Sequence, residues 1–358
     1  MIIASNFVKK RNNSLFHCIK AACPLYYHSG IRNSIYSTKY FYSEISIDIC
    51  CSYGYYDIAP YEPGGMFVLL QQLVNGLMLG SVYSLIALGY SMVYGVLGFI
   101  NFAHGDIFMW GAFFGLLLAR LGLPFPIILV LVPVFSAVLG MAVERIAYKP
   151  LRKASRLVLT SSALGMSIFL SNLARLVIGS ATYPIPKLIQ NEVYSIGGAV
   201  QINKMQIIVF ATAIVLMVFL NLFIKKSSRG KAMRAVAENS MVAGLMGINF
   251  DRVVSLTFAI GSAAGGIAGF LVGMYYDAVY FSMGYSAGIK AFSAAILGGI
   301  GSIPGAMVGG IALGLIENLG VAYLSSGWRD AICFIVLLLI LMIRPSGIFN
   351  ANIYDKKA

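Results

Sequence analysis

The chain has 358 residues, a mean hydropathy of +0.83 and only 11% charged residues, although its formal net charge is +13. A soluble globular domain is nearer one quarter charged, so this chain lacks the polar surface that a water-soluble fold needs. The positive charge alone would suit nucleic acid, but the basic residues lie in short segments beside apolar runs and no base-stacking module accompanies them. This distribution argues against nucleic-acid binding and indicates a membrane protein.

Residues 1–65 differ in character from the rest of the sequence. They hold nine of the 21 tyrosines and four of the five cysteines, whose spacing matches no zinc or redox motif. Their basic, acid-poor beginning resembles a transit peptide, but the composition changes abruptly at Met66. We expect Met66 to be the true start and residues 1–65 to lie outside the fold. A genuine extension and a targeting segment are the alternatives.

Long apolar stretches follow one another from Met66 onward. Residues 157–179, 205–224 and 253–276 are examples, and each is close to the roughly 20 apolar residues that a helix needs to cross a bilayer. Helices are favoured because an open backbone is not tolerated in hydrocarbon and barrel strands are shorter. The sequence predicts an all-α polytopic membrane protein over residues 66–350, a bundle of about eight to ten transmembrane segments. Residues 351–358 are expected to form a cytoplasmic tail.

Three polar residues interrupt an apolar region within the segment NFAHGD. Asn101, His104 and Asp106 stand between two uncharged stretches, with glycines on both sides. Because polar side chains are costly at membrane depth, they persist where they face protein or a water-filled path. We expect a broken helix here, with Asp106 near a helix N-terminus. The cluster either lines a translocation path or holds two half-helices together, and His104, the only histidine after residue 65, does not suggest a metal site.

Two basic segments predict the membrane topology. Residues 145–156 and 225–252 together carry 11 of the 20 Lys and Arg residues found from Met66 onward. The positive-inside rule therefore places both of them in the cytoplasm, and it places residues 180–204 on the outer side.

Several charged residues at the ends of apolar runs are expected to have structural roles. Glu144 and Arg145 end one such run and are expected to pair or to reach toward the interface. Lys290 is expected to pair with Asp277 or to cap a helix. Glu317 is expected at the end of its helix or facing the bundle.

Glycines at a spacing of four predict close helix packing, because helix association in lipid relies on small residues that let backbones approach. They fall in two glycine-rich segments. The residues are Gly261, Gly265, Gly269 and Gly273 in the first segment, and Gly301, Gly305 and Gly309 in the second.

A polar segment separates two of the predicted membrane helices. Residues 231–246 combine good helix formers with mixed polarity and precede the breaker Gly247. They predict a short amphipathic helix on the cytoplasmic face, which would bind a partner in a groove or rest on the anionic leaflet.

The segments NFAHG, ERIAYKPLR (144–152), RAVAENSMVAGLMGIN (234–249) and KAFSAAILGGIGSIPGAMVGG (290–310) resemble the first permease subunit of branched-chain amino-acid ABC importers. The resemblance covers residues 66–350. It implies a bacterial inner-membrane protein that works with a second permease subunit, two ATP-binding subunits and an extracytoplasmic substrate-binding protein. It also implies that Arg234, Glu238, Gly244 and Gly247 belong to a loop that couples the permease to the ATP-binding subunits.

The sequence has no G-x-x-x-x-G-K-[ST] phosphate loop. We therefore expect a transport subunit rather than an enzyme, with no cofactor of its own and with ATP bound by partner subunits. The leading hypothesis is a permease for branched-chain or hydrophobic amino acids that works by alternating access. A permease for urea or short amides is one alternative. The other is a stand-alone ion-coupled carrier or channel that would use His104, Asp106 and Glu317.

Overall fold

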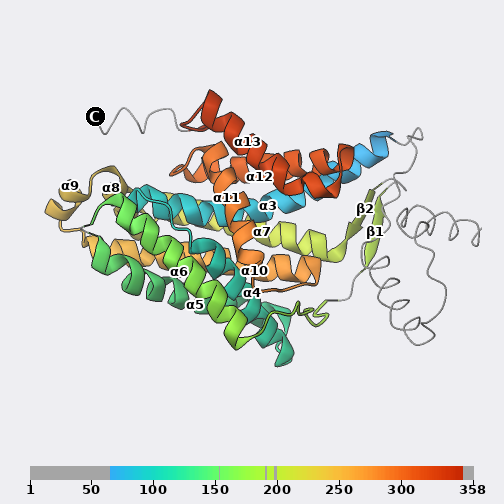
Figure 1. Ribbon diagram of the computed structural model, residues 1–358, viewed down its shortest axis with the longest axis horizontal. Coiled ribbons are helices and arrows are strands. Elements are labelled where there is room, and N and C mark those ends of the chain that lie inside the picture. Colours follow the sequence, from blue (N-terminus) through green and yellow to red (C-terminus); the bar gives the residue numbers. More distant parts are fainter. Residues whose placement is uncertain (1–64, 153, 190–191, 197–199, 350–358) are drawn as a thin grey trace, which may run out of the picture. The chain divides into compact units, whose positions relative to one another are not determined.

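The computed structural model describes residues 65–349 except 153, 190–191 and 197–199 (Figure 1). The predictions for residues 1–65 and 351–358 therefore lie outside the described residues, apart from Gly65.

The described chain is almost entirely helical. The longer helices are α3 (Gly65–Leu97), α4 (His104–Arg120), α5 (Phe125–Val143), α6 (Arg156–Val177), α7 (Lys204–Lys226), α8 (Ser228–Glu238), α10 (Phe250–Tyr276), α11 (Met283–Gly298), α12 (Ile303–Tyr323) and α13 (Arg329–Ile343). The shorter elements are α9 (Ser240–Leu245), the helical turns Glu144–Tyr148, Lys149–Leu151 and Ser326–Trp328, and the antiparallel strands β1 (Val193–Ile196) and β2 (Val200–Asn203).

Seven helices in the described residues are long and apolar enough to cross a membrane. Two shorter helices, α4 with 17 residues and α11 with 16, pack among them. At a rise of about 1.5 Å per residue, each of these two reaches roughly 25 Å, a little less than the hydrocarbon core. The prediction of an all-α polytopic membrane protein is confirmed.

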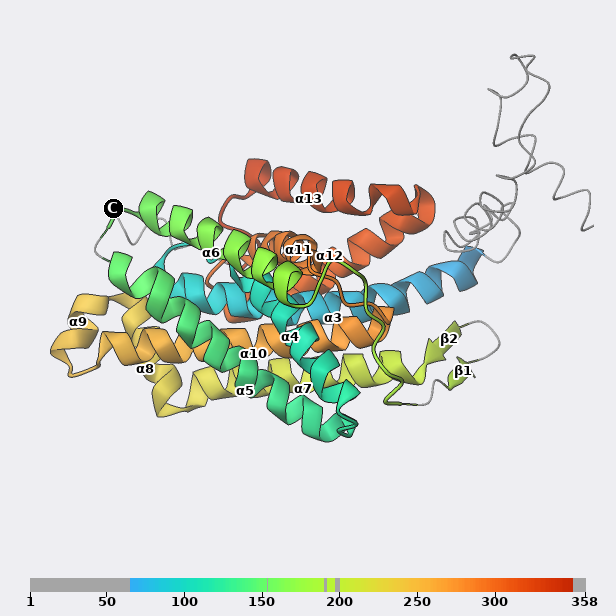
Figure 2. The same cartoon turned by 60° about the horizontal axis from the view of Figure 1, so that its bottom comes forward.

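Helices α3 and α10 form the centre of the bundle. The apolar window of α3 is 94% buried, whereas that of α13 is only 11% buried. Helix α3 packs against α12, α10, α11 and α7, and α10 packs against α4 and α5 (Figures 1 and 2). The exposed surfaces of α5, α6, α7 and α13 carry large apolar side chains. Lipid suits such surfaces, so these helices form the periphery.

The two basic segments meet at one end of the bundle, which we call the inner end because the positive-inside rule assigns it to the cytoplasm. Arg152, which follows α5, binds both Glu144 and Asp251, and Asp251 lies in the first turn of α10. Ser255 donates a hydrogen bond to Glu144 at 2.8 Å. The expected pairing of Glu144 with Arg145 is therefore wrong. The turns after α5 bring Arg152, rather than the adjacent Arg145, over the buried carboxylate.

The opposite, outer end carries the β1–β2 hairpin (Figure 1). Gln71 of α3 forms two hydrogen bonds with the backbone of Gln201 in β2, at 2.9 and 2.8 Å. Lys204 pairs with Glu192 at 3.3 Å. Hydrogen bonds from Tyr194 and Lys204 hold the pKa of Glu192 below its ordinary value.

The glycine stripe of α10 lies against two helices. A Cβ on Gly261 would lie 3.4 Å from the Gly89 carbonyl of α3, and one on Gly269 would overlap the Phe108 carbonyl of α4. Gly265 faces His104. Gly273 differs from these three, because its nearest contacts are side chains that lie outside the helices. The stripe therefore allows α3 and α4 to approach α10 closely.

The second glycine stripe is only partly as expected. Gly305 and Gly309 of α12 face the backbone of α11 at Gly298 and Ala294. Gly301, expected on the same stripe, lies in the turn between α11 and α12 with φ +91°. Gly301 therefore does not belong to the α12 stripe, because α12 starts only at Ile303 and the turn uses the left-handed backbone that glycine adopts readily.

Candidate functional site

The NFAHGD segment is the break between α3 and α4. Helix α3 ends at Leu97, and Gly98 adopts φ +70°. Helix α4 then begins at His104, whose N–H donates to the Asn101 carbonyl at 3.2 Å. Asp106 lies in the first turn of α4, as expected for an acid near the positive end of the helix dipole.

The break lies toward the inner end rather than at the middle of the bundle. Helix α4 runs from the break to Arg120, whose guanidinium lies over the Tyr183 ring in the outer connection between α6 and α7. The break itself packs against the cytoplasmic end of α5, because Phe99 contacts Tyr148 with ring centroids 5.2 Å apart. The two ends of α4 therefore lie at opposite sides of the bundle.

All three polar side chains of the break are buried, but each has its neighbours in a different element. Asn101 accepts a hydrogen bond from Tyr148 Oη at 2.6 Å. His104 contacts the Tyr90 ring edge-on, with centroids 4.8 Å apart, and lies against Gly89 and Gly265. Their neighbours thus belong to α3, α10 and the turns after α5.

Asp106 contacts a fourth element, helix α6. Its carboxylate accepts a hydrogen bond from Ser167 of α6. Asn101, His104 and Asp106 are close in sequence, but in the structure their side chains contact different elements and do not converge on one point. This arrangement favours the architectural interpretation of the cluster, in which the side chains hold neighbouring elements together. Direct contact with a transported substrate stays a prediction.

The segment expected to form one amphipathic helix forms two, α8 and α9. Asn239 separates them in extended backbone, and its side chain accepts hydrogen bonds from the N–H groups of Met241 and Val242. Because Asn caps a helix N-terminus better than it continues a helix, the single-helix prediction is wrong at this residue.

The two helices have an anchored face and a free tip. Met233 and Val236 of α8 and Ala243 of α9 are buried in a cluster with Met92 of α3 and Ile224 of α7. The tip carries large apolar side chains that are exposed in the described chain. They are Met241, Val242, Leu245 and Met246, exposed by 78%, 52%, 84% and 79%. Such a patch is typical of a surface that a partner covers.

Helices α8 and α9 and the turn that follows them, here called the α8–α9 unit, contain all four predicted coupling residues. Arg234 donates to the Lys225 carbonyl at the end of α7 at 3.0 Å, which ties α8 to the preceding helix. Glu238 is the last residue of α8, and Gly247 forms the turn after α9 with φ +81°. Gly244 has open space where a Cβ would project.

A buried ionic cluster joins α11, α12 and α13 near the outer end. Glu317 is fully buried and accepts a hydrogen bond from Lys290 at 3.1 Å. Lys290 also pairs with Asp330 at 2.9 Å, and Arg329 lies 3.5 Å from Glu317. The cluster contains two positive and two negative groups, so its formal charge is balanced. The predicted Lys290–Asp277 pair is wrong, because Lys290 lies in the middle of α11 and faces α12 and α13.

Sequence reasoning missed three of these relationships. Tyr148, Arg152 and the Lys290–Glu317 pair join segments far apart in the chain, and no local pattern links the partners. The charges at membrane depth did signal that partners were needed. Within the described residues, no three His, Cys, Asp or Glu side chains gather in a way that could hold a metal ion.

Comparison with known proteins identifies the family. Residues 72–341 match the family model described as the branched-chain amino acid transport system permease component. The chain belongs to the branched-chain amino-acid transport permease family. This permease contains the break, the α8–α9 unit and the ionic cluster entirely within the matched region.

Individual relatives agree with the family assignment. The permease is 43% identical over 300 residues to the high-affinity branched-chain amino acid transport system permease protein LivH of Salmonella typhimurium, covering 80% of this chain and 97% of the relative. It is 45% identical, with the same coverage, to BraD of Pseudomonas aeruginosa, which has the same description. A probable LivH of Methanocaldococcus jannaschii is 28% identical, covering 78% of this chain and 92% of the relative.

These findings confirm the family resemblance, the fold class and the leading functional hypothesis. The permease is a multi-pass inner-membrane transport component. The similarity supports an amino-acid permease over the urea and ion-coupled alternatives, since the relatives are described as branched-chain amino-acid permeases.

Proposed function

We propose that this permease is the membrane subunit of an ATP-driven importer of branched-chain and other hydrophobic amino acids. Its partners are a second permease subunit, two ATP-binding subunits and an extracytoplasmic substrate-binding protein. The binding protein delivers the amino acid to the outer end, and ATP-driven closure of the partner subunits at the inner end switches the access of the bundle.

The exposed tip of α9 is the observation that carries this proposal. Three large apolar side chains of the six-residue α9 and that of Met246, which follows it, project at the cytoplasmic face, where an isolated helix of that length would not be stable. The helix is stable here because its other face is buried against the bundle. This combination of an anchored base and an uncovered apolar tip fits a helix that docks in a groove of another protein.

The packing of α8 and α9 gives a physical path from a partner subunit docked on α9 to the membrane helices. Their buried face contacts Met92 of α3 and Val253 of α10. Helices α3 and α10 are the centre of the bundle, so a displacement of α9 is transmitted to the core of the bundle. Arg152 adds a second connection, because it joins the start of α10 to the end of α5.

The energy source lies outside this chain. The sequence contains no phosphate loop of the Walker type, which supports a subunit without an ATPase site of its own. ATP would then be bound by the partner subunits. A proton-coupled carrier would instead need the buried His104 and Asp106 to titrate during transport.

A pair of glycine-to-tryptophan substitutions tests the coupling. Gly244 on α9 and Gly165 on α6 both have open space for at least 4 Å around the point where a Cβ would lie. Both glycines are also exposed, so a large side chain at either position can point away from the bundle. Only Gly244→Trp is expected to abolish co-purification of the ATP-binding subunits and ATP-driven uptake of leucine into proteoliposomes. Both variants should remain folded, with unchanged thermal unfolding of the isolated permease.

Two results would count against the proposal. One is normal co-purification and uptake by the Gly244→Trp variant. The other is leucine uptake by wild-type vesicles that responds to a proton gradient and not to ATP. If urea or acetamide inhibited the uptake of leucine, the alternative of a permease for urea or short amides would be favoured instead.

A further inference from the structure

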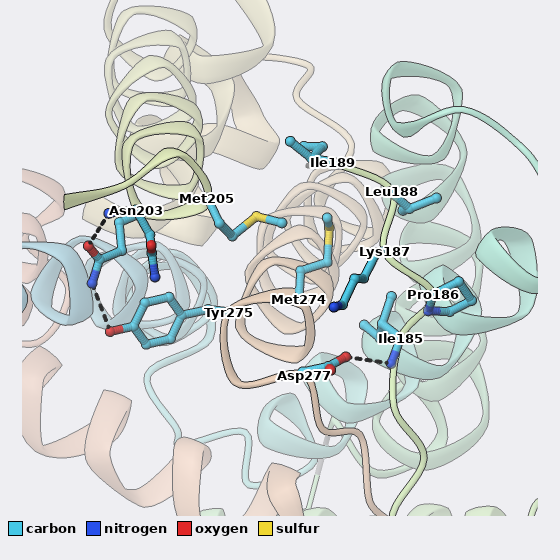
Figure 3. A pocket seen from close by; sticks show the side chains of 11 residues that line it. Ile185, Pro186, Lys187, Leu188, Ile189, Asn203, Met205, Met274, Tyr275 and Asp277 are labelled. Carbon is cyan, nitrogen blue, oxygen red and sulfur yellow. Dashed lines mark hydrogen bonds between the residues drawn. The ribbon is translucent and has the colours of Figure 1, made fainter. Parts of the chain in front are cut away.

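A small pocket opens at the outer end of the permease. It has a volume of about 100 Å³ and lies between three segments. These are residues 185–189, the start of α7 and the end of α10. In Figure 3 the side chains of Met205, Met274 and Lys187 point into the same space, and Asp277 lies at its edge. Neither the break between α3 and α4 nor the α8–α9 unit contributes to this pocket.

The lining of the pocket combines an apolar base with one charge of each sign. Ile185 and Met274 are buried, and Met205 is half-buried. Lys187 and Asp277 are exposed at the mouth. Methionine side chains are flexible and polarizable, so they adapt to apolar groups of different shapes. A matching ligand therefore has a short apolar group together with an amine and a carboxylate.

The volume limits the size of the apolar group. A cavity of roughly 150 Å³ holds one benzene molecule. A pocket of about 100 Å³ is smaller than such a cavity, so it suits a short aliphatic group such as an isopropyl or a butyl group. The charged ends of the ligand would stay at the mouth, where the ammonium of Lys187 and the carboxylate of Asp277 are accessible.

Asp277 is held in an unusual conformation at this position. It ends α10 with φ +49° and is the one non-glycine residue of the described chain with positive φ. Aspartate is one of the few non-glycine residues that adopt this conformation, because its short side chain forms local hydrogen bonds. One carboxylate oxygen accepts a hydrogen bond from the Ile185 N–H at 3.1 Å. This bond fixes the direction of the carboxylate and the adjacent wall of the pocket.

Gln206 and Tyr275 form one polar wall of the pocket. Gln206 donates hydrogen bonds to Tyr275 Oη and to Asn75 Oδ1, both at 3.3 Å. Gln206 and Tyr275 also line a second, apolar pocket that contacts Val82 of α3 and Val209 of α7. The Gln206–Tyr275 pair therefore lies between the outer pocket and a second, much smaller apolar pocket of about 10 Å³ between α3, α7 and α10.

We propose that the outer pocket is an entry site for the zwitterion of a branched-chain amino acid, an inference that rests on the proposed function. Lys187 binds the substrate carboxylate and Asp277 binds its ammonium group. Met205 and Met274 contact the branched side chain. The site receives the amino acid after its release at the outer face and before it passes the Gln206–Tyr275 pair.

Photolabelling of the assembled transporter tests this site directly. The probe is the diazirine analogue of leucine, added to the transporter purified without its substrate-binding protein, and the labelled peptides are mapped by mass spectrometry. We expect labels on the peptides that contain Met205 and Met274. Free leucine should compete with the label, whereas leucinamide, which lacks the carboxylate, and N-acetylleucine, which lacks the ammonium group, should not.

Three variants sharpen the test. Lys187→Met and Asp277→Asn each remove one charge, and the asparagine oxygen keeps an acceptor for the Ile185 N–H. Each variant should weaken competition by leucine about tenfold, since a hydrogen bond to a charged group contributes on that scale. Lys204→Met is the matched control, because Lys204 lies at the same end but pairs with Glu192 and does not line the pocket.

The outcomes separate the site from the function. Labels elsewhere, or labels in the pocket that leucine does not displace, would overturn the entry site, while ATP-driven leucine uptake by the same transporter once its substrate-binding protein is added back leaves the proposed function standing. Equal effects of Lys187→Met and Lys204→Met would also overturn it. Absence of ATP-driven leucine uptake by the wild type in the presence of the substrate-binding protein would overturn both.

Discussion

Tyr148 donates a hydrogen bond of 2.6 Å to Asn101 Oδ1, and this bond connects the cytoplasmic end of α5 to the break between α3 and α4. Both residues are buried. The same turns contain Glu144, which Arg152 links to the first turn of α10. The break is therefore tied to the element that follows the α8–α9 unit, and a movement of that unit has a physical connection to it.

Removing the Tyr148 hydroxyl should destabilise the inner end of the bundle. Tyr148→Phe leaves the buried oxygen of Asn101 without its donor, at a cost of about 1–3 kcal/mol. The measurement is thermal unfolding of the detergent-solubilised permease. Tyr285→Phe is the control, because Tyr285 is 71% exposed. An equal melting temperature for the two variants would contradict a structural role for this hydrogen bond.

Two glycine-to-alanine changes should have opposite effects. A Cβ on Gly111 of α4 would overlap the backbone of Gly266 in α10, so Gly111→Ala must force the two helices apart. Gly165 of α6 has nothing within 4 Å, and Gly165→Ala should stabilise its helix by about 0.5–1 kcal/mol. Denaturation in mixed micelles would compare them. Similar stability for both variants would show that α4 and α10 are not packed as closely as described.

Neutralising Glu317 should be more harmful than neutralising Asp330. Glu317 is fully buried between Lys290 and Arg329, whereas the side chain of Asp330 is 66% exposed. Glu317→Gln leaves buried positive charge uncompensated, and breaking a buried pair in this way costs about 3–5 kcal/mol. Asp330→Asn should cost about 1 kcal/mol or less, as for an exposed pair. The folded yield and the melting temperature are the measurements.

A double substitution separates charge imbalance from the loss of a contact. Lys290→Met combined with Glu317→Leu removes one charge of each sign and should recover much of the stability that Glu317→Gln loses. A double variant that is no more stable than the single one would show that the specific hydrogen bonds, rather than the balance of charge, hold α11 to α12.

Arg152→Lys should loosen the cytoplasmic end even though it keeps the charge. The guanidinium binds Glu144 with one nitrogen and Asp251 with another, and the single ammonium of lysine does not reproduce this fork. We expect faster trypsin cleavage within residues 225–252 in inside-out vesicles. Arg145→Lys is the control, since Arg145 is exposed in the neighbouring turn. Unchanged cleavage in Arg152→Lys would mean that the loop is held by its apolar contacts alone.

Local sequence was sufficient to predict the membrane environment, the helical class, the α3–α4 break and a segment between α7 and α10 that does not span the membrane. Hydropathy over some 20 residues decides whether a helix can cross lipid. The glycines around Asn101 and His104 and the cost of polar groups in hydrocarbon predict a break at that point. Composition also separated residues 231–246 from the membrane helices. It did not predict that Asn239 would divide them, because capping competes with helix continuation at a single residue.

Tertiary structure alone decided which polar groups meet. Lys290 and Glu317 are 27 residues apart, Tyr148 and Asn101 are 47 apart, and Arg152 and Asp251 are 99 apart. The outer pocket likewise combines residues 185–189 with the ends of α7 and α10. Hydropathy shows that a helix lies in lipid but leaves its neighbours and its rotation open. Those are set by the close approach of backbones at glycines such as Gly111 and Gly269, which depends on the whole bundle at once.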